Sequence, residues 1–256
     1  MKKVLKISLW MVGLAGISVL VGFIEKEHQK ITCKSIEVIL DYNDSDPLID
    51  ADMIKADVYK TYDTLIGKRI SEINQVQIED FVAQNNYVKN AEVYSTLNGH
   101  LKIKVTQKEP LLRIMNQKGE NYYLDMNASL MPVKSGYSTR LLVATGYIKT
   151  AYSDTVGLIN IENFPELQNL YQLALYVRSS EFLSAQIEQI YVTENGEYEL
   201  VPKVGRQLIE FGDISDMEQK FDNLISFYQK GMKKAGWDTY KTINLKYRNQ
   251  VVCTKK

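Results

Sequence analysis

The hydrophobic pattern of the chain begins with one long apolar run. Residues 7–24 read ISLWMVGLAGISVLVGFI and contain no charged side chain. A helix of this length rises roughly 27 Å, close to the hydrocarbon thickness of a bilayer, so we expect a single transmembrane helix. Three lysines lie in the short segment 1–6, which places the N-terminus in the cytoplasm by the positive-inside rule. The chain beyond a linker at 25–30 is then expected outside the cytoplasmic membrane.

A cleaved signal peptide is the main alternative for this run. Such a peptide requires small residues at a cleavage site just after its apolar region. The run ends in VGFI at residues 21–24, and a charged segment follows it without that pattern. The sequence therefore favours an uncleaved anchor.

The next pattern is that of a small α+β module. Alternating apolar residues predict a strand at 31–40. Asp50 can cap the first of two amphipathic helices. Two further strands at 88–96 and 100–107 flank Asn98-Gly99, a strong hairpin signal because both residues tolerate positive φ. The predicted order is βααββ, in which two helices can cover one face of a three-stranded sheet.

From residue 111 onward, short alternating runs predict a larger, mostly antiparallel β domain with packed helices. Pro165 opens one helix. Ser215-Asp-Met-Glu218 matches a capping box that opens another, and Gly231 is expected to end it. Asn195-Gly196 marks a second hairpin. The expected strands lie at residues 111–116, 121–125, 141–145, 186–193, 198–202, 208–211, 239–247 and 250–254.

Charge and candidate chemistry point away from catalysis and nucleic acid. The chain has 31 basic and 31 acidic residues without a long block of one sign, so it lacks the footprint of a nucleic-acid-binding protein. His28 and His100 stand in no metal-binding spacing, and no nucleophile or phosphate-loop motif occurs. Residues 41–52 lack the glycine and glutamate of a calcium loop. We therefore expect no catalytic residue, metal or cofactor, and we expect Cys33 and Cys253 to be free thiols.

Several stretches together resemble one bacterial family. YVKNAEVY at residues 87–94, the strand at 99–105 and Lys108-Glu-Pro110 resemble the end of a POTRA domain. Residues 119–125 and 141–146 resemble the start of the β domain of FtsQ/DivIB division proteins. Residues 240–252 resemble that family's closing "D-L-R-Y/F-x-N-x-V-V", with Asn244 and Lys246 in place of the usual Asp and Arg.

The resemblance implies a non-enzymatic, single-pass scaffold that links early and late division proteins. Its expected parts are a cytoplasmic tail (1–6), a transmembrane helix (7–24), a linker (25–30), a POTRA-like domain (31–110) and a β domain (111–256). It implies partners similar to the bitopic proteins FtsB and FtsL, further divisome partners for the POTRA-like domain, and a location at the septum of the inner membrane with the bulk of the chain in the periplasm. The alternative is a POTRA-containing secretion or outer-membrane assembly factor. The lack of many alternating segments about ten residues long argues against it.

The C-terminal strand carries most of the functional expectation. A final strand can leave one row of N–H and C=O groups unpaired, and such an edge is a template for another chain's strand. The resemblance favours partner binding there over a strand that is interior to the sheet. The expected partner-binding residues are Tyr247, Arg248, Asn249, Gln250, Val251 and Val252.

Overall fold

A computed structural model of the protein describes residues 10–11, 13–16, 31–43, 45–62, 64–134, 140–153 and 161–256. The chain folds into two units, with the boundary between Gln107 and Lys108 and with residues 44–46 belonging to the second unit. Within these described ranges, no helix is both long and apolar enough to cross a membrane. The segment 7–24 lies largely outside them, so the anchor and the domain ranges given above stay predictions.

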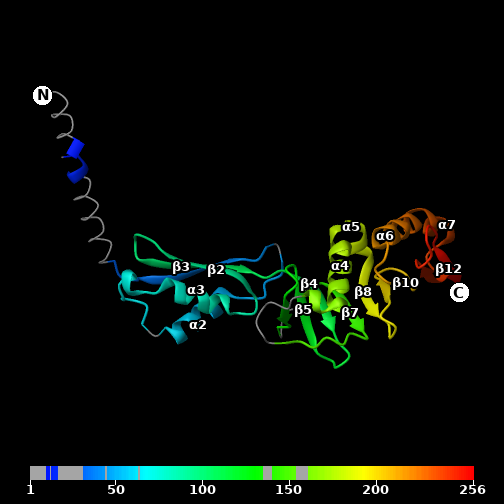
Figure 1. Ribbon diagram of the computed structural model, residues 1–256, viewed down its shortest axis with the longest axis horizontal. Helices are drawn as coiled ribbons and strands as arrows, with labels where there is room; N and C mark the ends of the chain where they lie inside the picture. The colour runs from blue at the N-terminus through cyan, green and yellow to red at the C-terminus, as the bar shows by residue number, and fades with distance from the viewer. Residues whose placement is uncertain are drawn as a thin grey trace. The chain divides into compact units, whose positions relative to one another are not determined.

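The first unit is a three-stranded sheet with two helices on one side (Figure 1). Its middle strand is the last in sequence, since the order is β1-β3-β2, with β1 parallel and β2 antiparallel to β3. This arrangement confirms the α+β class and the predicted βααββ order. The elements are β1 (Ser35–Asp41), α2 (Ala51–Thr61), the 3-10 helix η1 (Ile70–Glu72), α3 (Gln75–Ala83), β2 (Val88–Ser95) and β3 (His100–Gln107).

Local signals in the sequence account for most of this unit. Asp50 caps α2 by accepting a hydrogen bond from the Asp52 N–H at 2.7 Å, and Ile54 and Val58 are buried on the same helix face. Gly99 turns the hairpin with φ of +84°, and a Cβ there would overlap the carbonyl oxygen of Thr32. Only glycine fits this turn, because both its conformation and its surroundings exclude a side chain.

The second unit contains one nine-stranded sheet in the order β12-β11-β10-β9-β8-β7-β4-β5-β6. Five of its eight strand pairs are antiparallel, and the pairs β4–β7, β7–β8 and β10–β11 are parallel. The strands are β4 (Pro110–Met115), β5 (Asn121–Asp125), β6 (Leu130–Pro132), β7 (Leu142–Gly146), β8 (Ile187–Val192), β9 (Tyr198–Pro202), β10 (Leu208–Gly212), β11 (Tyr240–Asn244) and β12 (Val252–Lys255).

Helices pack on one face of this sheet and form the crossovers of the parallel pairs β7–β8 and β10–β11, whereas β5 and β6 lie between the strands of the parallel pair β4–β7 in the chain (Figure 1). Leu167, Leu170 and Ala174 of α4 are buried against the strands, as predicted for the helix that Pro165 opens. Phe221 of α6 lies between Phe211 and Tyr176. The helical elements are η2 (Ile161–Asn163), α4 (Pro165–Ser179), α5 (Glu181–Gln186), α6 (Met217–Ser226), the π-helical turn η3 (Phe227–Gly231) and α7 (Met232–Ala235).

Two sequence predictions about the α6 region are wrong. Asp216, not Ser215, is the N-cap of α6; it has φ of +53° and makes no side-chain cap hydrogen bond. The helical segment also does not end at Gly231, because it continues through η3 into α7 and stops at Gly236. The Phe227 ring explains the second difference. A Cβ on Gly231 would lie 2.8 Å from this ring, so the glycine makes room for an aromatic side chain instead of ending the helix.

Candidate functional site

The last strand of the chain is also the end strand of the large sheet. β12 pairs antiparallel with β11, with Ile243 opposite Cys253 and Asn244 opposite Val252, and the sheet order gives it no second neighbour among the described strands. Cys253 packs against the hydrophobic core, whereas the Val252 side chain is 41% exposed. Because side chains alternate along a strand, Val252 and Thr254 lie on the face opposite the helices.

The expected partner-binding residues fall mostly in the turn before this strand. β11 ends at Asn244 and β12 begins at Val252, so both strands are shorter than the sequence pattern predicts. Tyr247, Arg248, Asn249 and Gln250 are exposed turn residues, and Asn249 adopts φ of +59°. Val251 is half-buried beside the core. Of the six residues, only Val252 belongs to the end strand, and a role of any of them in partner binding stays a prediction.

Backbone and side-chain hydrogen bonds fix the first half of this turn. The Leu245 N–H donates to the Glu210 carbonyl oxygen at 2.9 Å, which keeps Leu245 buried beside β10. The Lys246 N–H donates to Asn244 Oδ1 at 2.9 Å, and this hydrogen bond stabilises a turn in which the chain leaves the direction of β11. Lys246 Nζ lies 2.6 Å from Glu197 Oε2, and this carboxylate raises the pKa of Lys246.

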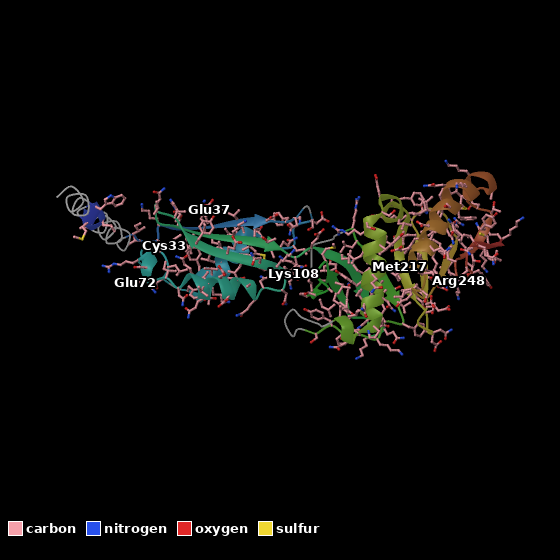
Figure 2. The ribbon with its side chains drawn as sticks, turned by 45° about the horizontal axis from the view of Figure 1, so that its top comes forward. Cys33, Glu37, Glu72, Lys108, Met217 and Arg248 are labelled. Carbon is pink, nitrogen blue, oxygen red and sulfur yellow. The ribbon has the colours of Figure 1, made fainter. Side chains whose placement is uncertain are left out.

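The second half of the turn contacts the start of α6. Arg248 Nε lies 3.2 Å from Asp216 Oδ2, and Gln219 Nε2 donates to Asn249 Oδ1 at 2.5 Å. Met217 and Arg248, which mark the two segments, are labelled in Figure 2. Both side chains of the Arg248–Asp216 pair are well exposed, so water and salt screen it and its contribution is at most about 1 kcal/mol. Tyr247, the residue before Arg248, is 52% exposed.

A small hollow of about 180 Å³ lies between α6 and the turn, and a buried lysine lines it. Lys220 Nζ donates to the Asp213 carbonyl oxygen at 2.8 Å and to Asp213 Oδ1 at 3.0 Å, and it sits 5.1 Å from the Phe211 ring centroid. This hydrogen bond to the ammonium lowers the pKa of Asp213. Lys220 was not among the residues expected from the sequence. The sequence feature that could have identified Lys220 is its position three residues after Met217, on the apolar face of an amphipathic helix.

Two glutamates lie opposite each other on adjacent strands near the same end of the sheet. Glu199 of β9 is the register partner of Glu210 of β10, and Glu210 is in turn opposite Asn244 of β11. Burial raises the pKa of Glu199, and the neighbouring Glu210 carboxylate raises it further. Asn244 Nδ2 donates to Glu210 Oε2, so the asparagine in the closing motif makes a polar contact with an acid rather than adding a third negative charge to this row.

Little in the described residues resembles catalytic machinery. Ser35 Oγ lies 2.7 Å from His100 Nδ1, but the two residues are register partners on adjacent strands, and a hydrogen bond between strands accounts for the contact. His28 lies outside the described residues. Within the described ranges, no cluster of three or more histidines, cysteines or acids could hold a metal ion. Cys33 is buried, Cys253 is half-buried, and both are free cysteines.

The two units together define a class of protein, a POTRA-like domain followed by a large open β sheet. A family model for the POTRA-like domain matches residues 31–106. A second model, described as FtsQ/DivIB, C-terminal related, matches residues 109–254, which is more than half of the chain. The protein therefore belongs to the FtsQ/DivIB family, a family of non-enzymatic cell-division proteins that interact with other divisome components. No curated protein matches the chain.

Proposed function

We propose that this protein is a single-pass membrane scaffold of the bacterial division machinery that binds FtsB-like and FtsL-like partners by strand addition at β12. It catalyses no reaction, and it tethers its partners at the septum, where shared attachment to the inner membrane raises their local concentration. The POTRA-like unit supplies a separate contact for other divisome proteins. The main support is the place of β12 at the end of the sheet, with β11 as its one neighbour among the described strands.

The length of β12 indicates how much of the affinity the backbone can supply. In an antiparallel strand, alternate residues direct both N–H and C=O outward, so a four-residue strand offers about four hydrogen bonds. At about 0.5–1.5 kcal/mol each, they supply roughly 2–6 kcal/mol. Association costs about 4–15 kcal/mol, so even the upper end of the backbone contribution gives only very weak binding. Side chains beside the edge must contribute the remainder.

Tyr247 is the best candidate for such a side chain. Tyrosine is enriched among residues that dominate binding energy, because its ring buries a large area at little entropic cost. Here Tyr247 is exposed on the turn that leads into β12, while Lys255, the last residue of the strand, and Lys256 after it carry positive charge. Charged residues of this kind discourage non-specific pairing of an open edge.

Binding of the FtsB-like partner from the same genome to the full-length protein tests this function. Tyr247→Ala and truncation after Asn249 are expected to abolish capture. Tyr147→Ala, which removes another exposed tyrosine of the same unit, is the matched control and is expected to bind normally. Full-affinity capture by the truncated protein would contradict the proposal.

Selective N-methylation of the partner's strand distinguishes strand addition from other contacts. Methyl groups on the alternate residues that donate to β12 are expected to prevent binding, and methyl groups on the intervening residues are expected to be tolerated. Equal tolerance of both sets would refute strand addition. Midcell bands of a fluorescent fusion favour the division role, whereas a uniform rim would favour the alternative role in envelope secretion or outer-membrane assembly.

A further inference from the structure

A second concave surface lies away from the C-terminal edge, in the second unit, which contains the nine-stranded sheet and is called the β-sheet unit below. It is a cleft of about 490 Å³, within the roughly 300–1,000 Å³ typical of ligand sites. Leu111, Ala174, Val177 and Ile187 line it and are buried. The cleft thus offers an apolar floor large enough for a bulky side chain.

Strand addition cannot occur at this cleft. Its lining comes from the interior strands β4, β7 and β8, from α4 and α5, from Arg140 and Leu141 just before β7, and from Lys203 just after β9. Strands β9, β10 and β11 separate β8 from the end strand β12. An occupant must therefore insert side chains rather than pair its backbone, and it would not compete with a strand bound at β12.

The rim of the cleft is basic. Arg140, Arg178 and Lys203 line it, and Glu188 is the one acid among the described lining residues. Arg178 already pairs with Glu109, and Lys203 Nζ donates to the Ser184 carbonyl oxygen at 2.8 Å.

Arg140 differs from the other two basic residues. Its side chain is exposed, and it has no hydrogen-bond or ion-pair partner in the part of the chain that the structure describes. One guanidinium is therefore available beside an apolar floor. A guanidinium donates two parallel hydrogen bonds to the oxygens of one carboxylate, which makes a single carboxylate the best complement.

We propose that this cleft binds a peptide segment of a partner protein that presents a large aliphatic side chain next to one carboxylate. The aliphatic group fills the floor between Val177 and Ile187, and the carboxylate pairs with Arg140. A dianionic phosphate is a poorer match, because a second cation would have to leave its present partner. This contact is independent of the C-terminal edge and gives the β-sheet unit two binding surfaces.

N-acetyl-L-leucine is a minimal probe, because it joins one aliphatic side chain to one carboxylate. It is titrated into the methyl-labelled full-length protein and followed by the NMR shifts of the Leu142, Val177 and Ile187 methyl groups, with Ile243 as a distant reference. A ligand this small is expected to bind with Kd on the order of 1 mM. Neutral N-acetyl-L-leucinamide and N-acetylglycine, which lacks the aliphatic group, are each expected to bind at least about threefold more weakly.

The matched protein variants are Arg140→Gln and Arg206→Gln. Both arginines are exposed, but Arg206 does not line the cleft. Arg140→Gln is expected to weaken N-acetyl-L-leucine about three- to tenfold and to leave the leucinamide unaffected, while Arg206→Gln changes neither. Equal affinity for the acid and the amide, tighter binding of hexyl phosphate than of N-acetyl-L-leucine, or no shift at the cleft methyls would each overturn the proposal.

Discussion

Replacing Lys220 by methionine should destabilise the β-sheet unit by about 2 kcal/mol. Methionine keeps much of the unbranched stem that packs on the core and removes the ammonium. Three contacts disappear with it, two to Asp213 and one to the Phe211 ring.

The magnitude follows from the different surroundings of these contacts. The hydrogen bond from the buried ammonium to the Asp213 carbonyl oxygen is charge-assisted and contributes about 1.5–3 kcal/mol. The Asp213 side chain is 70% exposed, which limits the ion pair to about 0–1 kcal/mol. The Phe211 ring adds about 0.5–1 kcal/mol. Recovering the desolvation cost of the lysine offsets part of this total and leaves about 2 kcal/mol.

The assay is urea denaturation of the full-length protein monitored by tryptophan fluorescence. The chain has two tryptophans, Trp10 and Trp237, so a Trp10→Phe background leaves Trp237 as the reporter of the β-sheet unit. The Trp237 ring packs against Tyr228 in a tilted arrangement, with ring centroids 5.7 Å apart. Asp213→Asn, which retains the carbonyl oxygen, is the control and should cost less than about 1 kcal/mol. A Lys220→Met protein as stable as the parent would refute this reasoning.

Three other perturbations test different parts of the structure. Gly99→Ala should destabilise the first unit by more than about 2 kcal/mol, because its Cβ would overlap the Thr32 carbonyl oxygen. Gly67 has the same φ of +84° but open space around it, so Gly67→Ala should cost about 1 kcal/mol. The urea midpoints of the two variants give the comparison. Phe221→Ala should cost about 3–5 kcal/mol by leaving a cavity in the core, measured by the same unfolding assay. The pKa of Asp213 is lower in the folded protein than its unfolded value of about 3.9. The ionised Asp213 carboxylate therefore stabilises the fold above that pH, and this stabilisation is lost as pH falls through the folded pKa. The free energy of unfolding should drop more between about pH 5 and pH 3 in the parent than in Asp213→Asn.

Short-range chemistry made much of the fold predictable. Asp50 and Pro165 begin helices because of their own capping and backbone preferences, and Asn98-Gly99 and Asn195-Gly196 each mark a hairpin whose glycine has positive φ. The alternation of apolar residues indicated the existence of most strands. These signals depend on a few neighbouring residues, so no knowledge of the remaining chain is needed to read them.

The errors occur where particular side-chain contacts, some of them only two to four residues apart, override the structure that a motif or an alternation predicts. Gly231 resembles a helix end, but the Phe227 ring occupies the space that its missing side chain leaves. Tyr247 continues the alternation of Ile243 and Leu245, yet the strand ends at Asn244, where side-chain and backbone hydrogen bonds redirect the chain. The parallel pairing of β10 with β11 also depends on α6 packing across the sheet, which no local pattern specifies.

Only part of the structure around the candidate site was predictable. The sequence predicted a strand at the C-terminus, and the sheet order places that strand at an end, while its role in partner binding stays a prediction. It did not indicate that most of the expected residues lie in a turn held against α6 by Asp216 and Gln219. Those contacts join residues about 30 positions apart, beyond the reach of periodicity.

Hydrogen exchange of the β12 amides, with and without the FtsB-like partner, tests strand addition most directly. In the free protein, the N–H groups of Val252–Lys255 that point away from β11 should exchange rapidly. Strand addition predicts that bound partner slows their exchange by at least about tenfold, while amides of the interior strand β8 keep their rates. Partner binding that leaves every β12 amide at its free rate would contradict it.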